Sequence, residues 1–90
     1  MKIISFEGIE GVGKSTQINM LYDLLVKKKF KVLIFREPGS TDTGEKIRNI
    51  LLNLDDSISV FSELFLMFAS RAQLIEEKIK NADCDFILLD

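Results

Sequence analysis

The residues most specific for chemistry lie in one short stretch, Gly8 to Ser15, which reads GIEGVGKS. Its spacing matches the phosphate-loop pattern Gly-x-x-x-x-Gly-Lys-[Ser/Thr]. Gly8, Gly11 and Gly13 allow turns in which successive backbone N–H groups point at phosphate oxygens. Lys14 supplies a full positive charge to terminal phosphates, and the Ser15 hydroxyl is an oxygen ligand suited to Mg2+. The stretch therefore predicts a site for a nucleoside triphosphate, with an incidental glycine-rich turn as the alternative.

Arginine is scarce in this chain, which has three arginines and nine lysines. The planar guanidinium of arginine can bind a phosphate or a carboxylate through two hydrogen bonds at once. Arg36 ends an apolar run, and Arg48 lies on a predicted helix. Arg71 follows Met67 by four residues and Leu64 by seven, so these three share one helix face. An apolar face with one guanidinium predicts a site for a flat, partly polar ligand such as a nucleobase. An ordinary exposed arginine is the alternative at each position.

Three short apolar runs predict the β-strands that position these groups: KIISFEG at 2–8, KVLIFRE at 31–37 and DFILLD at 85–90. The first run is apolar on both faces and therefore predicts a central parallel strand. Strands that alternate with helices predict an α/β fold with a parallel sheet, right-handed crossovers and helices on both faces. Ligands bind at the carboxyl ends of such strands, where the glycine-rich stretch, the segment REPG and Asp90 all lie.

Helical periodicity predicts three helices between these runs, at about 13–29, 43–54 and 61–79. The second begins with Asp42 and Glu45 at the spacing of a capping box. Apolar residues three and four apart predict the face that each helix buries. On the first helix they are Ile18, Leu21, Leu24 and Leu25, and on the third Phe61, Phe65, Phe68, Ala72, Ile75 and Ile79.

Composition and charge limit the classes to which the protein can belong. The chain has 90 residues, enough for one small domain, and its net charge of −2 with interspersed signs provides no basic face for nucleic acid. No apolar stretch approaches the ~18 residues of a membrane span. The single cysteine, Cys84, lies in an apolar segment and is predicted to be a small core residue in a reducing setting. These features predict a cytoplasmic protein without nucleic-acid or membrane partners.

Four motifs together resemble the N-terminal half of a bacterial thymidylate kinase. They are EGIEGVGKST, FREPGST continuing into GEKIR, LFLMFASRAQL, and the apolar strand that ends in Asp90, which is similar to the family's strand leading into Asp-Arg-aromatic. The resemblance covers all 90 residues. It implies a three-layer phosphate-loop NTPase fold of the nucleotide kinase type, with sheet order 2-3-1-4-5, truncated here after the third strand. The lid and the C-terminal strands would then be absent, which would leave the first strand as an unpaired apolar edge.

The resemblance also implies the ligands and the residues that hold them. The catalytic residues would be Lys14, Arg36 and Asp90, and the Mg2+ ligands Ser15 and Asp90. The ATP site would be made of Gly8, Glu10, Gly11, Val12, Gly13, Lys14, Ser15 and Thr16. The dTMP site would be made of Glu10, Arg36, Glu37, Pro38, Arg48, Met67, Phe68 and Arg71.

Four of these residues have individual roles by resemblance. Glu10, which electrostatics alone would turn away from the phosphates, is similar to the acid that contacts the sugar 3′-hydroxyl. Arg36 resembles the arginine that grips the acceptor phosphate, and Arg48 a second cation beside the acceptor. Arg71 resembles the residue that hydrogen-bonds the thymine edge.

Two positions depart from the family pattern. Where the family places a phenylalanine that stacks on thymine, this sequence has Met67 followed by Phe68, so either residue is a candidate for stacking. Gly11 stands where one branch of the family has a catalytic arginine, which implies the branch that supplies that arginine from a later lid. Pro38 corresponds to a proline that the family holds in cis, which would re-aim Arg36 and Glu37.

The resemblance implies that the parent protein, as a homodimer, transfers the γ-phosphoryl group of ATP to dTMP, and that residues 1–90 alone are inactive. The alternatives are a kinase for another nucleoside or nucleotide and a non-catalytic nucleotide-binding fragment. A GTPase-type switch is a further alternative, and it would continue after Asp90 with x-x-Gly.

Overall fold

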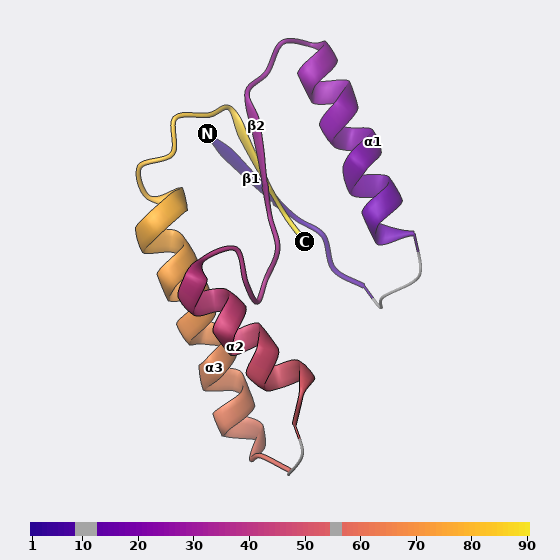
Figure 1. Ribbon diagram of the computed structural model, residues 1–90. Helices are drawn as coiled ribbons and strands as arrows, with labels where there is room; N and C mark the ends of the chain where they lie inside the picture. The colour runs from indigo at the N-terminus through magenta and orange to yellow at the C-terminus, as the bar shows by residue number, and fades with distance from the viewer. Residues whose placement is uncertain (9–12, 55–56) are drawn as a thin grey trace. The chain divides into compact units, whose positions relative to one another are not determined.

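The computed structural model describes residues 1–8, 13–54 and 57–90, which form two compact units. The sheet unit comprises Met1–Arg36 and Asp83–Asp90, and the helical unit comprises Glu37–Ala82. In chain order the elements are β1 (Lys2–Ser5), α1 (Lys14–Lys27), β2 (Val32–Phe35), α2 (Asp42–Leu52), α3 (Val60–Leu74), a π-helical turn η1 (Ile75–Ile79) and β3 (Phe86–Leu89) (Figure 1).

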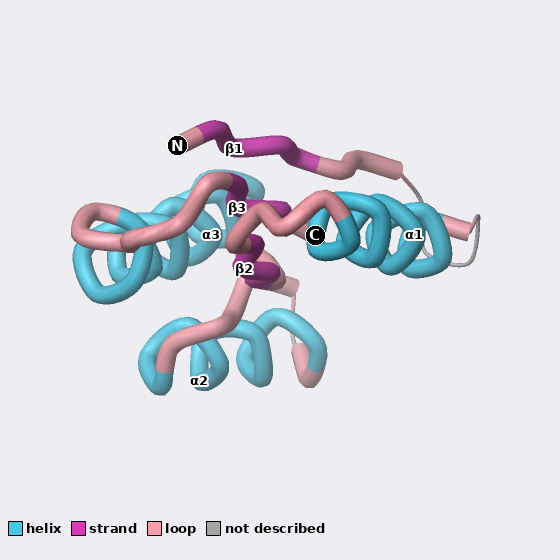
Figure 2. The backbone as a smooth tube through the Cα atoms, turned by 90° about the horizontal axis from the view of Figure 1, so that it is seen from above, coloured by secondary structure: helices cyan, strands magenta, loops and turns pink. Residues whose placement is uncertain are grey.

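The sheet unit contains three parallel strands in the order β1-β3-β2 (Figure 2). This confirms the predicted parallel sheet and the part of the strand order that the resemblance implied. The prediction of a central first strand from its apolar faces is wrong for residues 1–90, because β3 is the strand with a partner on each side; β1 lies at an edge, as the resemblance implied. Ile87 and Leu88 of β3 are 0% exposed, whereas Ile3 of β1 is 50% exposed. Apolar side chains on both faces therefore identified a strand without identifying its place in the sheet.

Helix α1 packs on the strands of its own unit through one apolar face. Its Ile18 and Leu25 form a buried cluster with Val32 and Leu88 of the strands. The predicted face is correct except for Leu24, which is 50% exposed. Leu21, which was predicted, and Tyr22, which was not, also pack against the cluster, three and four residues after Ile18.

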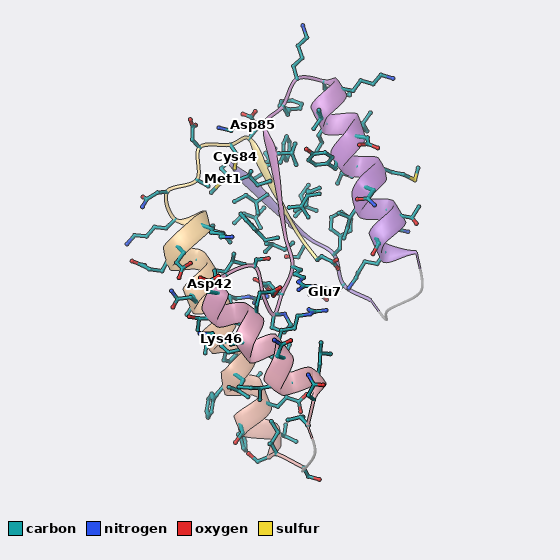
Figure 3. All side chains as sticks on the ribbon, in the orientation of Figure 1. Met1, Glu7, Asp42, Lys46, Cys84 and Asp85 are labelled. Carbon is teal, nitrogen blue, oxygen red and sulfur yellow. The ribbon has the colours of Figure 1, made fainter. Side chains whose placement is uncertain are left out.

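The ends of the strands are fixed by short polar and sulfur contacts. The Asp85 carboxylate accepts a hydrogen bond from the Lys31 backbone N–H at 2.8 Å, just before β2 and β3 begin. The side chains of Met1 and Cys84 lie together in Figure 3, with Sδ and Sγ 3.6 Å apart. Cys84 is half-buried, so the prediction of a core position is only partly correct.

Helix α2 begins one residue earlier than the capping-box spacing predicts. Thr41, in extended conformation, is the N-cap residue, and its Oγ1 accepts a hydrogen bond from the Gly44 N–H at 2.8 Å. Asp42 is therefore already helical, and Glu45 instead accepts from the Ser40 N–H at 3.3 Å. Thr41 rather than Asp42 is the N-cap because the extended backbone of Thr41 directs its hydroxyl oxygen at the N–H groups of the first turn.

Gly44 is required by close approach. A Cβ atom at this residue would lie 2.6 Å from the carbonyl oxygen of Gly39, nearer than real Cβ contacts come. The absent side chain lets the first turn of α2 lie directly against the loop that precedes it.

The predicted buried stripe of the long helix is wrong except at Ile79. Phe61, Phe65, Phe68 and Ile75 are 69, 64, 53 and 44% exposed, and Ala72 is also exposed. The buried positions are Ser70 and Leu74, followed by Ile79 in η1. In η1 the Lys80 N–H bonds to the Ile75 carbonyl, five residues back, so the helix is underwound there and the 3.6-residue periodicity is interrupted. The periodicity correctly placed the phenylalanines on one face of the helix, but it did not show that a different face is the buried one.

Candidate functional site

The N-terminus of α1 differs from those of the other two described α-helices. Its N-cap is Gly13, in left-handed conformation with φ 82°, and among the described residues no side chain caps it and no acid occupies its first turn. Helices α2 and α3 are capped by Thr41 and Ser59 and carry acids in their first turns. An uncapped helix N-terminus offers backbone N–H donors and a partial positive charge, which together suit a phosphate.

Lys14 and Asp90 meet at the carboxyl ends of the strands. The Lys14 Nζ lies 3.0 Å from Asp90 Oδ1, and their side chains are 15% and 32% exposed. Asp90 follows β3, and its backbone N–H bonds to the Phe35 carbonyl at the end of β2. Lys14 opens α1, which follows β1, the other neighbour of β3. The adjacency of β1 and β3 thus brings together two predicted catalytic residues that are 76 positions apart, from 14 to 90.

The structure describes only some of the other residues predicted for the ATP site. Ser15 and Thr16 are exposed in the first turn of α1, and Gly8 is exposed after β1 with φ 152°. Glu10, Gly11 and Val12 lie outside the described residues, so their predicted contacts are not tested.

The described residues fit a magnesium ion that is held mainly by a nucleotide. They contain no group of three or more histidine, cysteine, aspartate or glutamate side chains that could hold a metal. Ser15 contributes a hydroxyl oxygen and Asp90 a carboxylate. Mg2+ is commonly bound by one or two such protein oxygens together with phosphates and water.

The helical unit contains a pocket of about 100 Å³ between α3 and the loop before α2, hereafter the helical-unit pocket. Its lining is Glu37, Pro38, Leu64, Met67, Phe68 and Arg71. Five of these residues were predicted to bind the acceptor, and Leu64 was placed on the same helix face as Met67 and Arg71. Both candidates for stacking on a base, Met67 and Phe68, line the pocket. The structure therefore gathers an apolar slot with one arginine, as predicted.

Glu37 and Arg71 form a forked ion pair at this pocket. The Arg71 Nε lies 3.2 and 3.1 Å from the two carboxylate oxygens of Glu37, and Nη2 also bonds to Oε2. The Glu37 side chain is 16% exposed and that of Arg71 55%. The sequence predicted both residues for the site but did not predict that they bind each other.

The loop that carries Glu37 is held by side chains of α2 and α3. The Glu37–Pro38 peptide bond is cis, which confirms what the resemblance implied. The Pro38 carbonyl accepts a hydrogen bond from Arg48 Nη1 at 3.0 Å. The Gly39 N–H donates to Ser70 Oγ at 2.9 Å, and Ser70 is 1% exposed. These bonds fix the backbone that forms one wall of the helical-unit pocket.

Arg48 and Ser70 both hydrogen-bond the backbone of this loop, and the sequence predicted neither contact. Arg48 is half-buried and does not line the pocket, so its observed contact is with the Pro38 backbone. Ser70 was missed, although a small polar residue inside the apolar segment LFLMFASRAQL was a signal that could have indicated a buried hydrogen bond. Arg36, the last residue of the sheet unit, is exposed one position after β2.

No helix within residues 1–8, 13–54 and 57–90 is both long and apolar enough to cross a membrane.

The chain is similar to known proteins over nearly its whole length. A family model described as thymidylate kinase matches residues 6–87. A thymidylate kinase from Thermoanaerobacter sp. (strain X514) is 50% identical over 91 residues, covering 99% of this chain and 45% of that protein. One from Thermosipho africanus is 60% identical over 77 residues, covering 86% and 38%. The crystal structure of thymidylate kinase from Ehrlichia chaffeensis has a TM-score of 0.84 and 33% identity, covering 100% of this chain and 52% of that one. The chain thus spans about half the length of these relatives.

Proposed function

Because the chain belongs to the thymidylate kinase family, we propose that it acts as part of an enzyme that transfers the γ-phosphoryl group of ATP to dTMP, giving dTDP and ADP. The observation that carries the proposal is the match of the family model over residues 6–87. This range contains Lys14 and all the residues that line the helical-unit pocket. Phosphoryl transfer needs positioning and charge neutralisation more than covalent chemistry.

The donor side of the proposed site lies in the sheet unit. The uncapped N-terminus of α1 and the ammonium of Lys14 would bind the ATP phosphates, with Gly13, Ser15 and Thr16 beside them. Ser15 and Asp90 would hold Mg2+, which when bound neutralises charge on the phosphate oxygens. The remaining loop residues assigned to ATP are Gly8, Glu10, Gly11 and Val12.

The acceptor side has its base site in the helical unit. Leu64, Met67 and Phe68 would contact the faces of the base, and Arg71 would donate to its edge. Arg36 would grip the acceptor phosphate. Arg48 is proposed to support the site through its bond to Pro38, and Glu10 to contact the 3′-hydroxyl of the sugar.

A panel of acceptors tests this assignment. The full-length protein that contains this chain is incubated with ATP, Mg2+ and dTMP, dUMP or dCMP, and ADP release is measured. We expect dTMP to be the best acceptor, and much faster turnover of dUMP or dCMP would instead favour a kinase for another nucleotide.

Residues 1–90 alone are proposed to have no kinase activity, because they span 45% of one relative and 52% of the structural neighbour. The competing view is a nucleotide-binding fragment without turnover, and ADP release that depends on dTMP, from the purified 90-residue chain, would contradict the proposal.

The proposed enzyme is a cytoplasmic homodimer without nucleic-acid or membrane partners. The exposed phenylalanines of α3, including Phe61 and Phe65, support association because a folded chain rarely leaves such a row in water. The net charge of −2 supports the absence of a nucleic-acid partner. Sedimentation of the full-length protein as a monomer at micromolar concentration would contradict the dimer.

A further inference from the structure

We infer that Glu37 is a positioning residue, which fixes the orientation of the Arg71 guanidinium at the helical-unit pocket and so decides which ring edge the pocket accepts. This inference rests on the proposed function, in which the pocket receives the base of dTMP. It goes further because it assigns Glu37 an action through Arg71, whereas the resemblance implied only that Glu37 belongs to the dTMP site.

The contact between the two side chains has the geometry of an oriented pair. Both carboxylate oxygens of Glu37 face the Nε and Nη2 edge of the guanidinium. A forked contact of this kind fixes the plane of the guanidinium as well as its position, which a single hydrogen bond does not do. A ligand in the pocket would therefore meet an arginine whose remaining N–H groups already point in a set direction.

Glu37 is the anchored member of the pair. Its side chain is 16% exposed, whereas that of Arg71 is 55% exposed. The backbone next to Glu37 is held by Arg48 at the Pro38 carbonyl and by Ser70 at the Gly39 N–H. The carboxylate, bonded to both Nε and Nη2, restricts the rotamers of this long and exposed side chain and so preorganises it.

Charge decides what kind of group the pocket accepts. The negative charge of Glu37 balances the positive charge of Arg71, and the other lining residues are uncharged, so the lining carries no net charge. Such a pocket favours a neutral ring over a phosphate. Because a guanidinium only donates hydrogen bonds, it accepts a ring edge that carries a carbonyl oxygen and disfavours one that carries an amino group. The pair therefore favours thymine over cytosine.

The test compares Glu37→Gln with Glu76→Gln in the full-length protein. Glu76 pairs with Lys80 on the exposed surface of η1 at 3.5 Å, so both variants remove one charged partner of an ion pair, but only the first is at the pocket. We expect Glu37→Gln to raise the KM for dTMP about tenfold, with kcat within about twofold, because the base lies away from the reacting phosphate. The preference for dTMP over dCMP should fall about tenfold, while Glu76→Gln changes neither.

A double-mutant cycle separates positioning from direct contact. If Glu37 acts through Arg71, Glu37→Gln has no further effect on the KM in an Arg71→Met background, whereas a substrate contact of its own would add in full. Circular dichroism checks that each variant is folded, and Glu37→Asp, which keeps the charge, provides the readout if Glu37→Gln does not fold.

The outcomes distinguish this inference from the proposed function. If the unmodified protein does not phosphorylate dTMP, the proposed function fails and the inference fails with it. If it does, but Glu37→Gln leaves the KM and the dTMP preference within about twofold, or the two substitutions are additive, only the inference is overturned.

Discussion

The N-termini of α1 and α2 satisfy their first backbone N–H groups in different ways. Helix α2 uses the hydroxyl of Thr41, which is 4% exposed, and packs its first turn so tightly that only glycine fits at Gly44. Helix α1 follows Gly13, and among the described residues no side chain caps it and no atom lies within 4 Å of the position that a Cβ atom would take at Gly13.

The difference separates a structural helix end from one suited to a ligand. At α2 the protein supplies the capping hydroxyl itself, and the gain is stability of the loop beside the helical-unit pocket. At α1 no described side chain is a cap, and the proposed partner of its first N–H groups is a phosphate, with Lys14 in the same first turn. Substitutions at the N-terminus of α2 should therefore change the free energy of unfolding, and those at the N-terminus of α1 should change ligand binding.

The largest effect is expected at α1. Lys14→Met should lower turnover of ATP and dTMP by the full-length protein about 100-fold or more, because the phosphates lose a positioned charge. The free energy of unfolding should change little, since the Lys14–Asp90 pair is partly exposed. Lys46→Met, on the exposed surface of α2 (Figure 3), is the matched control. Unchanged ATP affinity and turnover in Lys14→Met would contradict the proposal that the N-terminus of α1 binds the ATP phosphates.

The next effect concerns packing at α2. Gly44→Ala should lower the free energy of unfolding by about 1–3 kcal/mol, because the new methyl group meets the Gly39 carbonyl and the backbone must shift. Urea denaturation measures the change. Thr43→Ala, one residue away and exposed, should stay within about 0.5 kcal/mol of the unmodified protein. Equal stability of the two variants would mean that the close approach at α2 has no energetic role.

The smallest effect concerns the cap itself. Thr41→Ala should lower the free energy of unfolding by about 1 kcal/mol through the loss of its bond to the Gly44 N–H. Ser59→Ala at α3 removes the same kind of bond in an exposed setting and should cost less, because water replaces the lost partner. A larger loss for Ser59→Ala, again measured in urea, would show that burial does not set the strength of these caps.

The sequence was most informative where local chemistry is specific. The three strands and their parallel pairing were predictable, because runs of apolar residues favour strands over a few residues and helices between them require parallel pairing. Three members of the helical-unit pocket, Leu64, Met67 and Arg71, were predictable from their helical spacing, whereas Glu37, Pro38 and Phe68 were implied only by the resemblance. The cap at Thr41 was missed by one residue, since Asp42 is an equally good capping residue and only the backbone decides between them.

Long-range features could not be read in the same way. The buried face of α3 depends on what lies against the helix, and hydrophobicity alone selected the exposed phenylalanines. The π-helical turn at Ile75–Ile79 changes the phase of the helix without a clear sequence signal. The Glu37–Arg71 pair joins residues 34 positions apart, and pairing of this kind requires the fold.

The loop from Glu37 to Thr41 belongs to two structures at once. Its first residues form a wall of the helical-unit pocket, and its last is the N-cap of α2. Opening of the first turn of α2 would release this wall, so fraying of the helix and occupancy of the pocket are thermodynamically linked. A bound ligand should then slow hydrogen exchange at the first amides of α2, although it touches none of them.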